Sequence, residues 1–174
     1  EFYEFYREKM IYRDAKPNIT HLLLAEWERE GRLESVITQN IDGLHQEAGS
    51  IRVLELHGSI HRNYCMDCGK YYDLNHILKT GGIPACSCGG MIKPDVVLYE
   101  EALKEAVLEE AVRSIGIADL LIIGGTSLRV YPAAGLIDYY HGNRLILINK
   151  AVTPYDSRAD LLINASLGEV FSQL

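Results

Sequence analysis

Polar residues that could carry out chemistry gather in the stretch from Thr38 to Gly58, TQNIDGLHQEAGSIRVLELHG. Gln39, Asn40 and Asp42 follow a β-branched, strand-like run, and His57 follows a second such run. Amide, carboxylate and imidazole groups at neighbouring strand ends are typical of a crevice at the carboxyl edge of an open α/β sheet. A single histidine is more often a satisfied core residue, but this combination favours a site.

Four cysteines form a second chemical cluster, in which a C-x2-C pair precedes a C-x-C pair and 17 residues lie between them. Glycines follow both pairs, as turn residues do around a metal knuckle. Four thiolates suit Zn2+ in a closed tetrahedral site that has no open position for catalysis. The pattern favours structural zinc over disulfides, redox chemistry or a catalytic metal. The predicted ligands are Cys65, Cys68, Cys86 and Cys88.

A third polar stretch follows the apolar run DLLIIGG, which predicts a strand buried on both faces. Its two glycines would let the backbone approach a ligand, and Thr126 and Ser127 offer hydroxyl and N–H groups to ribose or phosphate. Asn149 ends another strand, where doubly wound nucleotide-binding folds place a ribose-reading residue. Ordinary turns would also explain these residues, and the chain has no G-x-G-x-x-G motif. The residues alone therefore predict a nucleotide ligand but no reaction.

The elements that must position these groups alternate between strands and helices, which predicts an α/β fold with a Rossmann-like, doubly wound parallel sheet. The predicted strands are 33–38, 51–56, 96–99, 119–125, 145–149 and 161–164, and the predicted helices are 1–13, 17–31, 102–114, 132–140 and the chain end, with a short turn at 42–47. We predict a Rossmann-like domain over 1–59 and 95–174, a zinc-binding module over 60–94, and a candidate helical module at 1–16. The zinc ion is expected to fold a segment that is too small and polar to have its own core.

The composition of the chain limits the classes of protein to which it can belong. The 174-residue chain is 48% apolar and 24% charged, which supports a sizeable core and argues against disorder. Its net charge of -7 argues against a nucleic-acid partner. No run approaches the ~18 apolar residues of a membrane span and no signal peptide opens the chain, so we predict a cytoplasmic protein without a membrane partner. Because the sequence begins at Glu1 inside a predicted helix, a further amino-terminal segment is expected.

The motifs together resemble the sirtuin family of NAD-dependent protein-lysine deacylases, in its bacterial form. The matching blocks follow the family's order and span most of the chain: TQNIDGLH (38–45), LHGS (56–59), the four cysteines, KPDVVLYEE (93–101), GGTSLRVYP (124–132) and LINK (147–150). The family's Gly-Ala-Gly phosphate loop and mobile cofactor loop, which come earlier, do not occur in this sequence. We therefore expect the first βα unit of the sheet to be missing here, and this sequence alone to be incomplete for activity.

The resemblance implies NAD as co-substrate, structural Zn2+, and acetylated lysine of a protein or peptide as substrate. It implies His57 as general base, with Asn40 and Asp42 as the other catalytic residues. The implied cofactor-binding residues are Gln39, Asn40, Ile41, Asp42, Gly125, Thr126, Ser127, Asn149, Lys150, Glu169 and Val170. The implied substrate-binding residues, which would clamp the peptide as an added strand, are Val97, Leu98, Tyr99, Glu100 and Val130. Many relatives have Phe-Gly-Glu where this chain has Tyr-Glu-Glu, so the contact at Glu100 departs from the family pattern.

In the family's reaction, the amide oxygen of acyl-lysine attacks C1′ of the nicotinamide ribose and nicotinamide leaves. A ribose hydroxyl, deprotonated by the histidine, then attacks the acyl carbon, a step suited to an imidazole. No protein nucleophile is required, and zinc takes no chemical part. The resemblance thus implies an NAD-dependent protein-lysine deacetylase.

Acyl-chain preference also follows from the resemblance. Relatives that prefer succinyl or malonyl lysine carry a Tyr-x-x-Arg pair in the helix that aligns with 1–10. Here the matching positions are Tyr3 and Tyr6, and Arg7 lies one residue further on, rotated by about 100° on a helix. We therefore expect Arg7 to be a solvated helix charge and acetyl groups to be preferred over acidic ones.

Two other function classes remain open. One is a non-catalytic module of the same fold that binds NAD or ADP-ribose. The intact Asn40, Asp42 and His57 argue against it, whereas the missing phosphate loop argues for it. The other is a zinc-ribbon interaction module, which would leave that cluster unexplained.

Overall fold

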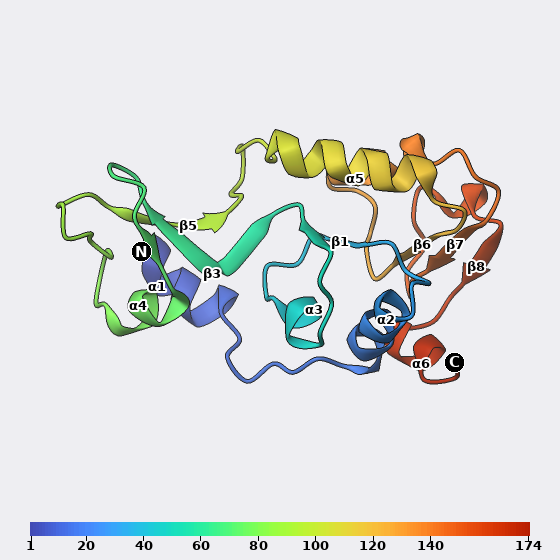
Figure 1. The fold of residues 1–174 in the computed structure, drawn as a ribbon, viewed down its shortest axis with the longest axis horizontal. Helices are drawn as coiled ribbons and strands as arrows, with labels where there is room; N and C mark the ends of the chain where they lie inside the picture. The colour runs from blue at the N-terminus through green and yellow to red at the C-terminus, as the bar shows by residue number, and fades with distance from the viewer.

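A computed structural model describes all 174 residues as an elongated molecule with three small sheets arranged along its length (Figure 1). Two sheets are parallel: one joins β1 (Val36–Thr38) to β2 (Val53–Glu55), and the other has the order β6 (Leu121–Gly124), β7 (Leu145–Ile148), β8 (Leu161–Ile163). The third is antiparallel, in the order β4 (Tyr71–Tyr72), β3 (Gly58–Cys65), β5 (Ile92–Val96). Parallel strands joined through helices confirm the predicted α/β class.

Only α2 (Ile19–Arg29) and α5 (Glu105–Ile117) are longer than seven residues. The other helices are short: α1 (Phe2–Phe5), which continues as the π-helical η1 (Tyr6–Met10), α3 (Leu44–Glu47), α4 (Leu74–Lys79), the 3-10 helices η2 (Ala133–Tyr139) and η3 (Asp156–Arg158), and α6 (Leu167–Phe171). The start of α2 is fixed by Asn18, whose side chain accepts hydrogen bonds from the backbone N–H groups of Thr20 and His21. The predicted turn at 42–47 is the single-turn helix α3.

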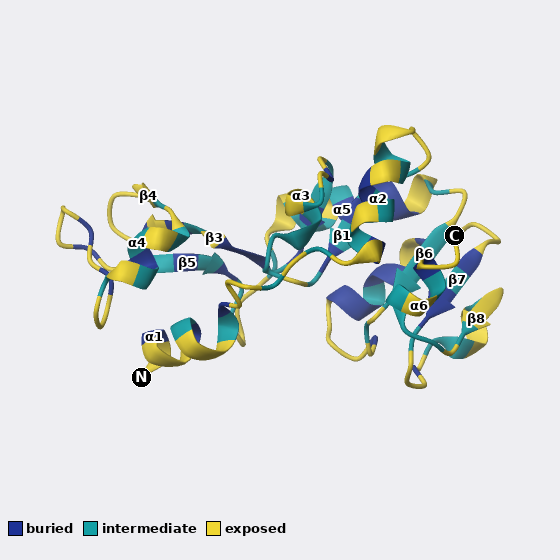
Figure 2. Cartoon of the chain, turned by 90° about the horizontal axis from the view of Figure 1, so that it is seen from below, coloured by how far each residue is buried: buried dark blue, intermediate teal, exposed yellow.

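One hydrophobic core lies beneath α5, where Ala111 and Ile115 pack with side chains of β2, η2 and β7. Figure 2 shows buried residues concentrated in β7, whereas β6 is only partly buried. The prediction that 119–125 is buried on both faces is therefore wrong. β6 lies at the edge of its three-stranded sheet, so it has a strand neighbour on one side only.

The predicted strand at 96–99 is also wrong, because the strand is β5 and ends at Val96. Pro94 lies inside β5, which is possible because β5 is an edge strand of its sheet. Beyond the strand, Val97 donates its N–H to the carbonyl of His57 at 3.0 Å, and Glu100 turns the chain with φ 68°. The next helix, α5, begins at Glu105 rather than at residue 102.

The cysteine-bearing part of the chain has a hydrophobic core, which corrects the expectation that zinc alone folds it. Its nine buried residues are Tyr3, Tyr6, Ile11, Ile60, Cys65, Ile77, Cys86, Ile92 and Val96. The amino-terminal residues complete this core, which a view of 60–94 alone could not reveal. The domain boundaries at residues 60 and 94 remain predictions, and β3 and β5 run across them.

Candidate functional site

The first part of the site lies where β1 and β2 end together. The backbone N–H of Leu56 donates to Thr38 at 2.9 Å, which extends the parallel ladder and brings Gln39 beside His57. His57 Nδ1 lies 2.9 Å from the carbonyl oxygen of Gln39. Since a carbonyl only accepts, Nδ1 carries the proton and Nε2 of the neutral ring keeps its lone pair. This is the tautomer that a general base requires.

The turn after β1 holds its polar side chains by local hydrogen bonds. The backbone N–H of Asn40 donates to Thr38 Oγ1 at 3.0 Å, and the Asn40 residue is exposed. Asp42 Oδ1 accepts the N–H of Leu44 at 3.0 Å, and Gly43, with φ 74°, caps the start of α3. One carboxylate oxygen of Asp42 is thereby used to shape the turn, and the other has no such bond within it.

The second part of the site lies at the carboxyl ends of β6 and β7. The backbone N–H of Gly125 donates to Ile148 at 3.1 Å, and that of Asn149 donates to Ile163 at 3.1 Å. The predicted residues Gly125, Thr126, Ser127, Asn149 and Lys150 therefore share one sheet edge.

A side-chain hydrogen bond links the turn after β1 to the turn after β6. Gln39 Nε2 donates to Thr126 Oγ1 at 3.4 Å, between residues that are 87 positions apart in the sequence. The structure thus brings the amide, carboxylate and imidazole cluster near β1 next to the Gly-Thr-Ser turn after β6.

Helix α6 lies beside the carboxyl end of β6, where its Leu167 side chain is close to Gly124 and Gly125. A Cβ at Gly124 would lie 2.3 Å from Leu167 Cδ2, so this glycine is needed for helix packing rather than for approach to a ligand. Glu169 and Ser166 form a capping box: Glu169 Oε2 accepts from the backbone N–H of Ser166 at 2.9 Å and from its hydroxyl at 2.7 Å. These bonds from Ser166 lower the pKa of the Glu169 carboxyl. Val170, the next residue, is half-buried on α6.

The predicted substrate-binding segment at residues 97–100 is hydrogen-bonded in its first half and exposed to solvent in its second half. Leu98 donates its N–H to Glu101 Oε2 at 2.9 Å, and Lys93 Nζ donates to the same oxygen at 3.0 Å. These contacts, the backbone bond first, lower the pKa of Glu101. Tyr99 and Glu100 are exposed, and Val130 is exposed on the separate loop that follows β6.

The four cysteine sulfur atoms all lie within 4.8 Å of one another. Cys65 and Cys88 are 3.5 Å apart, Cys68 and Cys86 3.6 Å, and Cys68 and Cys88 3.5 Å. Ligands about 2.3 Å from a tetrahedral zinc ion are separated by about 3.8 Å, so the arrangement fits Zn2+. The hydrogen bond from the backbone N–H of Cys88, followed by one from the Tyr72 hydroxyl, lowers the pKa of Cys86 to about 5, which favours the thiolate.

Three histidines near Asp42 were not predicted from the sequence. The rings of His21 and His45 are 4.6 Å apart, and the Asp42 carboxylate is close enough to act on both. His61 Nε2 lies 2.9 Å from the backbone oxygen of Asp42. The Asn-x-x-His spacing of 18–21 was a usable signal for a capping box, but nothing local points to His61.

The His21 and His45 pair predicts acid sensitivity of the fold. Burial lowers the pKa of both imidazoles, and for His45 the neighbouring His21 lowers it further. The unfolded chain therefore binds protons more readily, so the free energy of unfolding should be highest above about pH 6.5 and fall below it. Urea midpoints at about pH 7.5 and about pH 5.5, either side of the ordinary imidazole value, should show a smaller drop for His45→Gln than for the unaltered protein.

The exposed His141 provides the control, because His141→Gln should keep the full drop in urea midpoint. An identical drop in the His45→Gln protein would show that this pair does not control acid stability.

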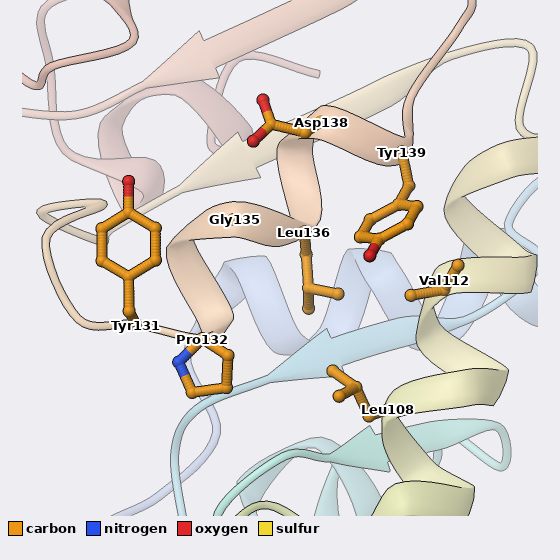
Figure 3. A pocket seen from close by; sticks show the side chains of 8 residues that line it. All are labelled: Leu108, Val112, Tyr131, Pro132, Gly135, Leu136, Asp138 and Tyr139. Carbon is orange, nitrogen blue, oxygen red and sulfur yellow. The ribbon is translucent and has the colours of Figure 1, made fainter.

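A separate cavity of about 330 Å3 lies between α5 and η2 (Figure 3). Its lining residues are Leu108, Val112, Tyr131, Pro132, Gly135, Leu136, Asp138 and Tyr139. None of the predicted site residues lines it, and its one carboxylate, on Asp138, is paired with Arg158. The cavity is therefore not part of the candidate site.

Comparisons with known proteins agree on one family. A model described as the Sir2 family matches residues 1–132. The chain is 62% identical over 172 residues to an NAD-dependent protein deacetylase of Clostridium acetobutylicum and 58% identical over 172 residues to one of Clostridium tetani, covering 98% of this chain and 70% of the relative in both cases. A solved structure of Sir2 with a p53 peptide and NAD+ is 41% identical, with a TM-score of 0.91 over 99% of this chain and 75% of that one.

Proposed function

We propose, from the premise that this chain belongs to the Sir2 family, that it is an NAD-dependent protein-lysine deacetylase. The observation that carries the proposal is the His57–Gln39 hydrogen bond, which in the neutral imidazole places the lone pair on Nε2, beside a turn linked to the Gly-Thr-Ser edge. A non-catalytic NAD-binding module would not need that tautomer.

NAD would supply the electrophilic ribose carbon and the nicotinamide leaving group, and the residues of this chain would orient it and move a proton. We assign proton removal from a ribose hydroxyl to His57 Nε2. Asp42 has a carboxylate oxygen left over from its bond to Leu44 and would accept from the carboxamide N–H. Asn40, with Ile41 and Gln39, would complete the nicotinamide and ribose pocket and hold the reacting bond in place.

The rest of the cofactor would lie along the edge of β6 and β7. Backbone and hydroxyl groups of Gly125, Thr126 and Ser127 suit ribose and phosphate oxygens. Asn149 and Lys150 would face the adenosine end, with Glu169 and Val170 as its border. This assignment is supported by the position of all these residues at strand ends or on the adjoining helix α6.

The acetyl-lysine peptide would add as a strand along residues 97–100, opposite Val130. The outer edge of β5, which leads directly into this segment, has no strand neighbour. Such an edge can pair with an extended peptide. The bond between Val97 and the His57 carbonyl would keep the added strand close to the base.

No helix of this chain is both long enough and apolar enough to cross a membrane. All four cysteines are free thiols, and a zinc thiolate site is typical of a reducing compartment. We therefore propose a cytoplasmic location, with protein or peptide partners rather than nucleic acid or membrane.

The proposal is tested by incubating the protein with NAD and an acetyl-lysine peptide. Free nicotinamide and deacetylated peptide should form in equal amounts. Binding of NAD without release of nicotinamide would favour the non-catalytic NAD or ADP-ribose module instead.

Acyl preference depends on Arg7, for which the prediction of a solvated charge is wrong. Its Nε donates to the carbonyl of Ile77 at 2.9 Å, and its terminal nitrogens donate to Tyr3 at 3.3 Å and Gly82 at 2.7 Å. The guanidinium therefore ties the amino-terminal helix to the zinc module, and three of its five N–H donors are committed to backbone carbonyls rather than to an acyl carboxylate.

We expect kcat/KM to be at least about tenfold higher for acetyl lysine than for succinyl lysine on one peptide, because a buried carboxylate without a counter-charge is costly to desolvate. Arg7→Lys should leave the ratio unchanged. A clear preference for succinyl lysine would show that another cation reaches the acyl group.

A further inference from the structure

Strand β3 leaves its regular ladder at its centre. Gly58 and Ser59 pair with Val96 and Asp95, but the next paired residue is Asn63, opposite Pro94. Pro94 has no N–H to donate, so the ladder cannot continue through it unchanged. Residues 60–62 are therefore released as a bulge. The ribbon of β3 bends along its length (Figure 1).

The bulge pairs with the turn that carries Asp42. Ile60 donates its N–H to Ile41 at 3.0 Å, and His61 Nε2 donates to the backbone oxygen of Asp42 at 2.9 Å. The His61 ring also lies against Gly43, where an added Cβ would be 2.8 Å from Cδ2 and Nε2. Two neighbouring backbone oxygens of the turn are thus bonded by two neighbouring residues of the bulge.

The bulge is itself held firmly. Arg62 donates to Glu55 at 2.7 Å and to Asp95 at 2.9 Å, and both carboxylates are largely buried. The backbone N–H of His61 donates to Ser59 Oγ at 3.3 Å, and the Tyr71 hydroxyl donates to the His61 carbonyl at 3.3 Å. These bonds hold the backbone of the bulge, from which the exposed His61 ring reaches the Asp42 carbonyl, and a side chain on a fixed backbone can set the position of the group it touches.

We propose that His61 is a positioning residue that sets the orientation of the Asp42 turn through the Asp42 carbonyl. The inference rests on the proposed function, since Asp42 and its neighbours are assigned there to the nicotinamide end of NAD. His61 touches neither cofactor nor substrate.

Two variants separate the hydrogen bond from the packing of the ring. His61→Phe keeps a flat ring against Gly43 but has no donor, whereas His61→Gln keeps an N–H group near the position of Nε2. We expect the Phe variant to raise KM for NAD about three- to tenfold, the range for loss of one partly exposed hydrogen bond, with a smaller change in kcat. The Gln variant should return KM to within about twofold, by the same reasoning.

A second readout does not depend on catalysis. Amide hydrogen exchange at Leu44 and Ile60, whose N–H groups bond the same turn, should be faster in His61→Phe and close to normal in His61→Gln. His141→Phe, at an exposed position, is the matched control and should change neither measurement. If the unaltered protein released no nicotinamide, the proposed function would be wrong. The difference in amide hydrogen exchange between the two His61 variants would still test whether His61 orients the turn. Unchanged KM and unchanged exchange in His61→Phe, or equal impairment in both variants, would overturn the inference.

Discussion

Replacing His57 by alanine is expected to lower the rate of deacetylation by about 10^2–10^4-fold, the range for loss of an acid–base group. The imidazole is oriented by the 2.9 Å bond from Nδ1 to the Gln39 carbonyl, so its role is to accept a proton at Nε2. Affinity for NAD should change much less, because bonds from Thr38, Leu44 and the bulge of β3 still hold the turn at 39–42 when the His57–Gln39 bond is lost.

His57→Asn sharpens this test. An asparagine amide can reproduce the Nδ1–H donor to Gln39 but has no base at the position of Nε2. It should therefore fold normally, bind NAD and remain as slow as the alanine variant. Nicotinamide release and peptide deacetylation are measured in parallel with NAD binding, with His141→Ala as a control at an exposed site. Turnover within about tenfold of normal in either His57 variant would remove this residue from the base role, since that lies below the usual acid–base contribution.

The local parts of the fold and site could be predicted from the sequence. His57 and Gln39 were expected at strand ends because β-branched runs precede both, and the ladder of β1 and β2 places them side by side. The cysteine spacing likewise predicted a set of four thiols that the structure gathers within 4.8 Å. In both cases the signal is short in sequence and its chemistry is carried by residue type.

The contacts that the sequence could not predict join distant segments. Gln39 meets Thr126 across 87 positions, and His61 reaches Asp42 only because Pro94 releases a bulge from a strand that pairs elsewhere. Strand β5 was missed for a related reason, since a proline inside a short polar run argues against a strand unless its position at a sheet edge is known. Such features depend on tertiary position rather than on local pattern.

The zinc module shows the same dependence on distant residues. Its core includes Tyr3 and Tyr6 as well as Cys65 and Cys86, two of the predicted ligands, whereas Cys68 and Cys88 are exposed, so the packed interior reaches one side of the predicted metal site. The Tyr3 hydroxyl donates to the carbonyl of Ile92, and Arg7 donates to the carbonyls of Ile77 and Gly82. Loss of zinc should therefore loosen the amino-terminal helix as well as the cysteine loops.

Cys86→Ser is expected to release zinc and unfold this module while the core beneath α5 persists. Apparent binding free energies of structural zinc, about 10–16 kcal/mol, match or exceed the stability of a whole small domain, about 5–15 kcal/mol. The module core includes two of the four predicted ligands, whereas the cluster around Ala111 and Ile115, which also has nine buried residues, contains none and should keep its protected amides.

Ser87→Ala is the matched control, because Ser87 lies between two ligands, is exposed, and should retain one zinc ion per chain. Metal content and site-resolved hydrogen exchange are measured on the same preparations. Exchange should rise in α1, β3 and β4 for Cys86→Ser only, since these elements share the module core or its sheet. Freshly purified unaltered protein without zinc would contradict the metal assignment. Loss of zinc with unchanged protection in α1 would instead show that the aromatic residues of the amino terminus hold this module together without the metal.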